Sequence, residues 1–224
     1  MGRAGPLCGI PCTDCRNAKE AVAMLYPHPF SAAYWRDAAA ELRDVRKLTF
    51  AALMIALCIV LSLIPSVPVG PAGVGAKITW GFLARSLCAL VCGPVLGIAF
   101  GFAEDILSFF LTGGGGYPFF PGYTLTTMLG VFLYALFLYR CPVTVRRIFC
   151  AKLLTNLENV TLGALWTAIL SGKAYWVTAP VSAVKNLVML PFQTVLLCAL
   201  FAALLPVLGR AGLVPKEAAG RLRL

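Results

Sequence analysis

Long apolar stretches alternate with short polar or glycine- and proline-rich breaks along most of the chain. An α-helix needs roughly 20 residues to cross about 30 Å of hydrocarbon. Breaks placed where Pro, Gly and charge cluster divide the apolar sequence into candidate membrane spans of about that length. There are six, at residues 48–64, 78–92, 94–111, 121–139, 148–170 and 180–206. The pattern therefore predicts an all-α integral membrane protein with six transmembrane helices in one bundle.

The first 47 residues precede this pattern and differ from it. Apolar side chains recur there at helical spacing with charges between them, at Phe30, Tyr34, Ala38, Leu42 and Val45. Such spacing favours a short amphipathic helix on the cytoplasmic membrane surface, although a plain cytoplasmic extension of the first span fits equally well. We expect three parts: the N-terminal extension (1–47), the six-helix transmembrane domain (48–208) and a basic cytoplasmic tail (209–224).

Composition and charge support a membrane protein and give its orientation. The chain is 60% hydrophobic and 12% charged, with a mean hydropathy of +0.85, against roughly 25% charged residues in soluble domains. Basic residues gather before the first span, between the fourth and fifth, and in the tail; the alternate loops carry only Lys77 and Lys173. The positive-inside rule then places both termini in the cytoplasm of a multi-pass cell-membrane protein. The net charge of +10 needs no nucleic-acid partner, because orientation and anionic lipid account for it.

Two adjacent carboxylates, Glu104 and Asp105, lie inside the third span. A charged side chain at a helix centre costs roughly 2.5 to 3.5 kcal/mol on insertion scales. If the second and third spans form a hairpin around Gly93, Arg85 falls about 5 Å, or one helical turn, from these carboxylates. We therefore expect Arg85 to pair with Glu104 or Asp105. A purely structural pair and a ligand-binding role fit equally well.

Further polar residues fall at a similar depth in other spans. Lys185 and Asn186 lie just below the outer end of the last span, and Tyr123 starts the fourth. Asn159 shares a helix face with Asn156, three residues earlier, whereas Glu158 is expected to point elsewhere. Polar groups converging from several spans predict a pocket for a polar organic molecule. The candidate substrate-binding residues are Arg85, Glu104, Asp105, Tyr123, Asn159, Lys185 and Asn186.

Other motifs suggest no further chemistry. Cys8, Cys12 and Cys15 have the chain's one histidine, His28, nearby, but they lack a fixed zinc spacing, so we predict no metal and no cofactor. Residues 70–79 resemble a phosphate-binding loop, yet Lys77 comes one place late and no Ser or Thr directly follows it. An enzyme within the bilayer would need a nucleophile and base that the spans do not offer. If the protein moves a solute, partners must supply the energy.

An ordered set of segments between residues 29 and 213 resembles a known family. The segments are FSAAYWRDAAAELRDVRKLTFAALMIAL, GPVLGIAFGFAEDIL, FFPGYTLTTMLGVFLYALFLYR, NVTLGALW with GKAY, and KNLVMLPFQ. They are similar to the folate-specific substrate-binding component of energy-coupling factor (ECF) transporters. The resemblance implies a six-helix protein that captures folate from the extracellular side. Its partners would be a transmembrane coupling subunit and two cytoplasmic ATPase subunits.

The resemblance also implies roles for individual residues. Ala52 and Ala56 match the family's Ala-x-x-x-Ala spacing, which lets the coupling subunit approach closely. The pteridine ring would find hydrogen-bonding partners among Asp105, Asn159 and Asn186 and a flat face at Tyr123. Lys77, Lys173 or Lys185 would receive the carboxylates of the glutamate tail. A component for another vitamin, or a scaffold subunit with no ligand, is the alternative.

Overall fold

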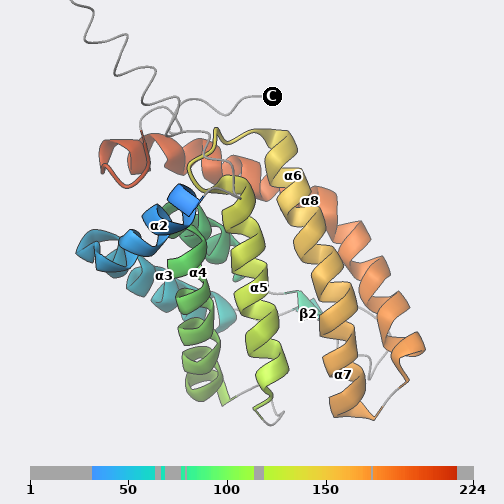
Figure 1. Ribbon diagram of the computed structural model, residues 1–224. Helices are drawn as coiled ribbons and strands as arrows, with labels where there is room; N and C mark the ends of the chain where they lie inside the picture. The colour runs from blue at the N-terminus through green and yellow to red at the C-terminus, as the bar shows by residue number, and fades with distance from the viewer. Residues whose placement is uncertain are drawn as a thin grey trace, which may run out of the picture.

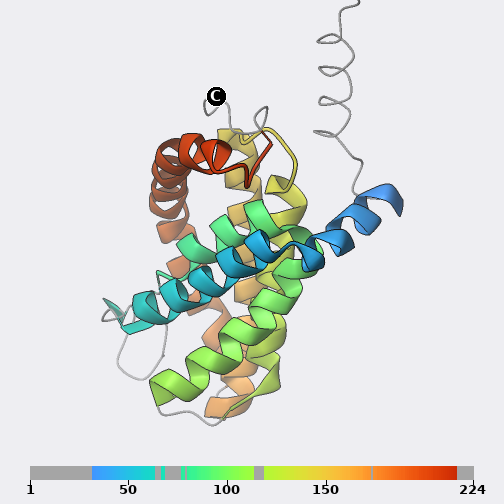
Figure 2. The same cartoon turned by 90° about the vertical axis from the view of Figure 1, so that its left-hand side faces the viewer.

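The structure is a computed structural model that describes residues 32–63, 67–68, 77–78, 80–113, 119–172 and 174–215. These residues are almost entirely helical (Figures 1 and 2). The elements, in order, are α2 (Ala32–Ala40), the 3₁₀ turn η1 (Glu41–Arg43), α3 (Val45–Leu63), α4 (Phe82–Thr112), α5 (Pro121–Leu138), α6 (Val145–Glu158), the π-helical η3 (Asn159–Gly163), α7 (Ala164–Ser171) and α8 (Tyr175–Arg210). A short antiparallel pair, β1 (Val67–Pro68) and β2 (Lys77–Ile78), lies between α3 and α4.

Four of the described helices, α3, α4, α5 and α8, are long and apolar enough to cross a membrane. The prediction of an all-helical membrane protein is therefore confirmed, while the count of six crossings stays a prediction. The buried core is centred on the first half of α4, where Cys88, Ala89 and Cys92 have no exposed surface. Small side chains at these positions let α3 and the second half of α4 pack closely around it.

Helix α4 folds back on itself at Gly93. Residues 19 apart, Arg85 and Glu104, are hydrogen-bonded, whereas a straight helix would separate them by roughly 28 Å. Gly93 has φ 72° and ψ −174°, a conformation essentially reserved for glycine. A Cβ atom there would also lie 2.9 Å from the ring of Tyr139. The predicted hairpin is confirmed, and glycine provides both the conformation and the space that it needs.

The predicted span at residues 148–170 is divided into three segments. The π-helical turn η3 separates α6 from α7, although Figure 1 shows α6 and α7 following one path beside α8. Wider π turns inside α-helices often occur at functional sites. The Thr161 hydroxyl donates to the carbonyls of Leu157 and Glu158, 3.0 Å away in each case, which satisfies backbone groups at this irregularity.

Helix α8 is longer than one straight crossing requires. Its 36 residues correspond to roughly 54 Å of helix, against about 30 Å of hydrocarbon. Figure 1 shows its first half beside α6 and its red end turned across the top of the bundle. Pro191 lies inside the helix, and proline bends a helix because it removes a backbone hydrogen bond. In the turned part, Leu197, Phe201 and Leu205 form a buried stripe.

Helix α2 occupies the position of the predicted amphipathic helix but is shorter. Tyr34 and Ala38 are buried, whereas Leu42 and Val45 are 43% and 73% exposed. The apolar face stops because α2 ends at Ala40 and Asp44 is extended, with φ −82° and ψ 104°. Phe30 lies outside the described residues. A position on the membrane surface stays a prediction.

Charged groups form a connected network at the end of the bundle that carries Arg140. The Tyr139 hydroxyl donates to Glu41, 2.8 Å away, and Lys47 forms a salt bridge with the same carboxylate. Arg140 lies 3.4 Å from Glu41 and 3.0 Å from Asp37. Burial alone would lower the pKa of Arg140, but the neighbouring Tyr139, Glu41 and Asp37 raise it above its ordinary value. We call this region the Arg140 end.

Candidate functional site

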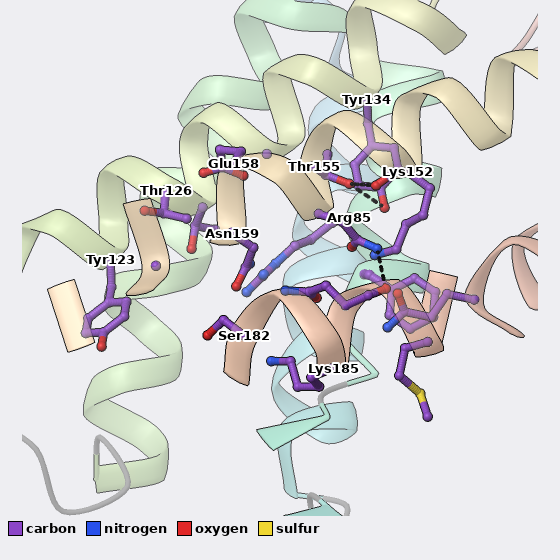
Figure 3. A pocket seen from close by; sticks show the side chains of 18 of the residues that line it. Arg85, Tyr123, Thr126, Tyr134, Lys152, Thr155, Glu158, Asn159, Ser182 and Lys185 are labelled. Atoms are coloured by element: carbon purple, nitrogen blue, oxygen red, sulfur yellow. Dashed lines mark hydrogen bonds between the residues drawn. The ribbon is translucent and has the colours of Figure 1, made fainter. Parts of the chain in front are cut away.

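A cavity of about 440 Å³ lies between α4, α5, α6 with η3 and α7, and α8 (Figure 3). This volume is within the range of small-molecule sites, roughly 300 to 1,000 Å³. Along α8 its lining extends from Thr178 to Gln193, a rise of roughly 22 Å. The cavity is therefore elongated. Its charged lining residues are Arg85, Asp105, Lys152, Glu158 and Lys185.

Arg85 is held in the cavity wall by Glu104. Its Nε donates to Oε2 and its Nη2 to Oε1, both at 3.0 Å, so the contact is bidentate. Glu104 is 2% exposed and lies behind Arg85 rather than on the cavity lining. The predicted pairing is thus confirmed, whereas the placement of Glu104 against a substrate does not match its position. Glu104 is turned toward Arg85 instead, whereas Asp105, the next residue on α4, lines the cavity.

Asp105 lines the cavity and has different partners from Glu104. Its two oxygens accept hydrogen bonds from the hydroxyls of Thr124 at 2.7 Å and Thr127 at 3.3 Å. Two hydroxyl donors on α5 therefore balance this carboxylate in place of an ion pair. The adjacent acids of the sequence serve two purposes: one orients a guanidinium, and the other presents a hydrogen-bonded carboxylate to the cavity.

Aromatic residues surround the end of the cavity at Tyr123. The Tyr123 hydroxyl lies 3.0 Å from that of Thr167, and the Trp166 indole donates to Thr126 at 3.0 Å. The rings of Phe120 and Trp166 lie 5.4 Å apart between centroids. These contacts tie the start of α5 to α7. They place Tyr123 on the lining, where the sequence predicts it.

The opposite end of the cavity contains residues that the sequence analysis missed. The Lys152 ammonium lies 4.6 Å from the centre of the Phe82 ring, a cation–π arrangement. Thr155 donates to the Tyr134 hydroxyl at 3.4 Å. Lys152 was detectable in principle, because it precedes Thr155 and Asn156 by three and four residues and so shares their helix face.

Glu158 also lines the cavity, so the expectation that it points elsewhere is wrong. It follows Thr155 by three residues, which places the two side chains only about 60° apart around the helix. The cavity is wide enough to include both. The Glu158 carboxylate makes no hydrogen bond or salt bridge within the described part of the chain, and its Oε1 is buried without a partner. Gly130 on α5 leaves room beside it, since a Cβ there would lie 3.5 Å from Oε2.

Helix α8 contributes further groups without internal partners. Lys185 lines the cavity and forms no hydrogen bond or ion pair with the residues that the structure describes. Asn186 Nδ2 and Gln193 Oε1 are buried with no hydrogen-bond partner in the part of the chain that the structure describes. The backbone carbonyl of Asn186 accepts from Asn156 Nδ2 at 3.2 Å. Buried polar groups without partners are costly, so this wall suits a polar occupant.

The structure brings together most of the predicted site. Six of its seven residues line one cavity, and Glu104 lies directly behind it. Asn156 and Asn159 share the cavity face as expected. Lys173 lies outside the described residues, and Lys77 belongs to β2. Figure 3 shows Arg85, Asn159 and Lys185 reaching toward the same part of the cavity from three different helical segments.

The fold and the site define a helical membrane protein that encloses an elongated polar cavity. A family model described as "ECF transporter, substrate-specific component" matches residues 46–205. The chain is 30% identical over 157 residues to the folate transporter FolT of Clostridium novyi (strain NT), an alignment that covers 70% of this chain and 88% of that protein. Its fold is similar to a crystal structure of FolT bound with folic acid, with a TM-score of 0.60, 24% identity, and coverage of 69% of this chain and 91% of that one. The chain belongs to the family of substrate-specific components of ECF transporters.

Proposed function

We propose that this protein captures folate from the extracellular side of the membrane and delivers it to an ATP-driven energy-coupling module for uptake. Similarity to the Clostridium novyi folate transporter supports this substrate. The observation that carries the proposal is the elongated cavity, whose wall contains the Lys185 ammonium and buried amide atoms of Asn186 and Gln193 that have no partner among the described residues. Folate is an elongated molecule with a flat hydrogen-bonding ring at one end and a dicarboxylate tail at the other.

Each part of folate has a counterpart in the cavity. The Lys185 ammonium receives a tail carboxylate, because charge-assisted hydrogen bonds are the strong ones in a water-poor site. Arg85 presents the guanidinium edge that Glu104 does not occupy. Tyr123 offers a ring face, and the amides of Asn159 and Asn186 offer donors and acceptors to the ring. Asp105 supplies a further acceptor beside them.

The proposed topology has six crossings, in which each half of α4 and the α6–η3–α7 segment count as one crossing each. In this arrangement, α3, the two halves of α4, α5, α6 to α7, and α8 are the six. The Arg140 end is cytoplasmic, and both chain termini lie on that side. The basic residues around Arg140 and in the tail support this orientation under the positive-inside rule. The chain then divides at residues 47 and 208, as the sequence predicts.

The partners are a transmembrane coupling subunit and two cytoplasmic ATPase subunits. Ala52 and Ala56 on α3 form the proposed contact with the coupling subunit. Both are exposed, and small residues four apart let another helix approach closely. Energy comes from the ATPases, so the present chain acts as the binding subunit and not as an enzyme.

Binding of folate to the isolated protein tests the proposal. The full-length chain is purified in lipid nanodiscs without ATPase subunits, and tritiated folic acid is added over a range of concentrations. We expect saturable, high-affinity retention of one folate per chain. Displacement by a different vitamin but not by folic acid would support a component for that vitamin. Failure to retain any vitamin would contradict the proposal and favour a scaffold subunit.

A further inference from the structure

Glu158 lines the cavity, but its carboxylate takes part in none of the hydrogen bonds and ion pairs that hold Glu104 and Asp105. Asp105 already accepts two threonine hydroxyls, and Glu104 is fully engaged by Arg85. Glu158, by contrast, makes no hydrogen bond or ion pair with any residue in the described ranges, and its Oε1 is buried without a partner. A carboxylate kept in the membrane without a partner requires a donor from elsewhere.

The surroundings of Glu158 suit a planar group more than a charged tail. It ends α6, immediately before the π-helical turn that starts at Asn159, and both residues line the cavity. Gly130 on the facing α5 places no side chain of its own beside the carboxylate, since a Cβ there would lie 3.5 Å from Oε2. Figure 3 shows Glu158 and Lys185 on different walls of the cavity. An anionic tail is repelled by the first and attracted by the second.

We propose that Glu158 accepts the two adjacent N–H donors of a 2-amino-4-oxo ring edge and thereby selects that ring chemistry. The inference rests on the proposed function and deepens it. The ring N3–H and the 2-amino group are adjacent and parallel, so one carboxylate can accept both in the bidentate geometry that it adopts with guanidinium. The Glu158 side chain rotates to bring its buried Oε1 to the cavity for this contact. The neighbouring Asn159 amide completes the edge by donating to the 4-oxo group. The glutamate tail then lies toward Lys185.

A ligand pair that differs at this edge tests the inference. Equilibrium binding to the purified full-length chain is measured for folic acid and for its 2-desamino-2-methyl analogue, which lacks the amino donor. The wild-type protein should prefer folic acid on the order of 10- to 100-fold, the usual effect of losing a hydrogen bond to a charged group. In Glu158→Gln the preference should collapse, because the amide replaces one of the two acceptor oxygens with an NH2 donor that faces the ring's own donor.

Lys185→Ala is the matched control, since it should weaken both ligands by the same factor and leave their ratio unchanged. Equal wild-type affinities for the two ligands would overturn the inference without any variant. So would a Glu158→Gln protein that keeps the wild-type preference. If Glu158→Gln does not fold, the wild-type ratio alone decides. Failure of the proposed function looks different, because the wild-type chain would then bind neither ligand.

Discussion

The Arg140 end and the cavity both gather charged side chains, but they use them differently. At the Arg140 end, Glu41 is shared by Lys47, Arg140 and the Tyr139 hydroxyl, and Asp37 pairs with Arg140. In the cavity, Lys185 and Glu158 have no such partners among the described residues, and the Asn186 and Gln193 side chains each have a buried atom without one. The charged groups at the Arg140 end are paired with one another, whereas these polar groups of the cavity have no partner among the described residues.

The difference separates a structural role from a binding role. Paired charges join α2, η1, α3 and the end of α5. The ring of Tyr139, the residue that follows α5, covers the turn of α4 at Gly93. Unpaired polar groups in a membrane protein lower its stability unless water or a ligand compensates them. Arg85 belongs to both categories, because Glu104 holds one edge of its guanidinium while the residue lines the cavity.

The largest effect is expected from removing the carboxylate behind Arg85. Glu104→Ala leaves a guanidinium uncompensated inside the bundle, and breaking a buried ion pair on one side costs about 3 to 5 kcal/mol. Denaturant unfolding of the purified protein measures this loss. Replacing both partners, as in Arg85→Met with Glu104→Leu, should recover most of the stability while losing folate affinity. Equal stability of Glu104→Ala and the wild type would contradict a supporting role for Glu104.

Gly93→Ala should destabilise the protein by about 3 kcal/mol, because it combines backbone strain with a clash. Gly113→Ala is the matched control. Gly113 also has φ 72°, but nothing lies within 4 Å of its would-be Cβ, whereas Gly93 faces the Tyr139 ring at 2.9 Å. The control should lose only about 1 kcal/mol. Thermal unfolding of both variants compares them, and equal losses would mean that packing at Tyr139 does not fix the α4 turn.

Lys185→Ala should change binding and leave folding nearly intact. Loss of a carboxylate partner weakens folic acid by about 2 kcal/mol, or roughly 30-fold. Pteroic acid, which lacks the glutamate tail, provides the control because its affinity should hardly change. Dissociation constants of both ligands are compared by equilibrium binding. Equal weakening of the two ligands would remove Lys185 from the tail site.

Asp37→Ala should have the smallest effect. Its salt bridge with Arg140 is half-exposed, with side-chain exposures of 49% and 24%, and such pairs contribute about 0 to 1 kcal/mol. Unfolding measured at low and high salt should show a small difference that salt removes. Glu41→Ala should cost more, since Glu41 is buried and has three partners. A larger loss for Asp37→Ala than for Glu41→Ala would contradict this order.

Much of the architecture follows from the sequence because it depends on local patterns. Apolar stretches and their breaks locate the membrane helices, and counting residues from Gly93 places Arg85 opposite Glu104. Most site residues were predictable for the same reason, since a polar side chain in an apolar helix must face something polar. What the sequence did not predict is the direction in which a given side chain points around its helix axis. A choice between adjacent residues, Glu104 or Asp105, depends on packing that no single helix specifies.

Irregular geometry was the part that the sequence could not predict. The π turn at Asn159–Gly163 has no proline to mark it in the sequence. Helix α8 contains three prolines, Pro180, Pro191 and Pro206, and the sequence does not say at which of them the helix bends. Glu158 was assigned to the wrong side because the cavity face of α6 is wider than an i, i+3 pattern suggests. The end of α2 at Ala40 likewise exposes Leu42 and Val45, which helical spacing alone would bury.

We propose that folate is held by the cavity groups that lack partners among the described residues. A structure of the purified full-length protein with folic acid tests it most directly. The account predicts the ligand inside the cavity, with a tail carboxylate within hydrogen-bond distance of Lys185 and the ring beside Asn159 and Tyr123. Folic acid bound elsewhere, or bound in the cavity with Lys185 and Asn159 both turned away from it, would contradict the account.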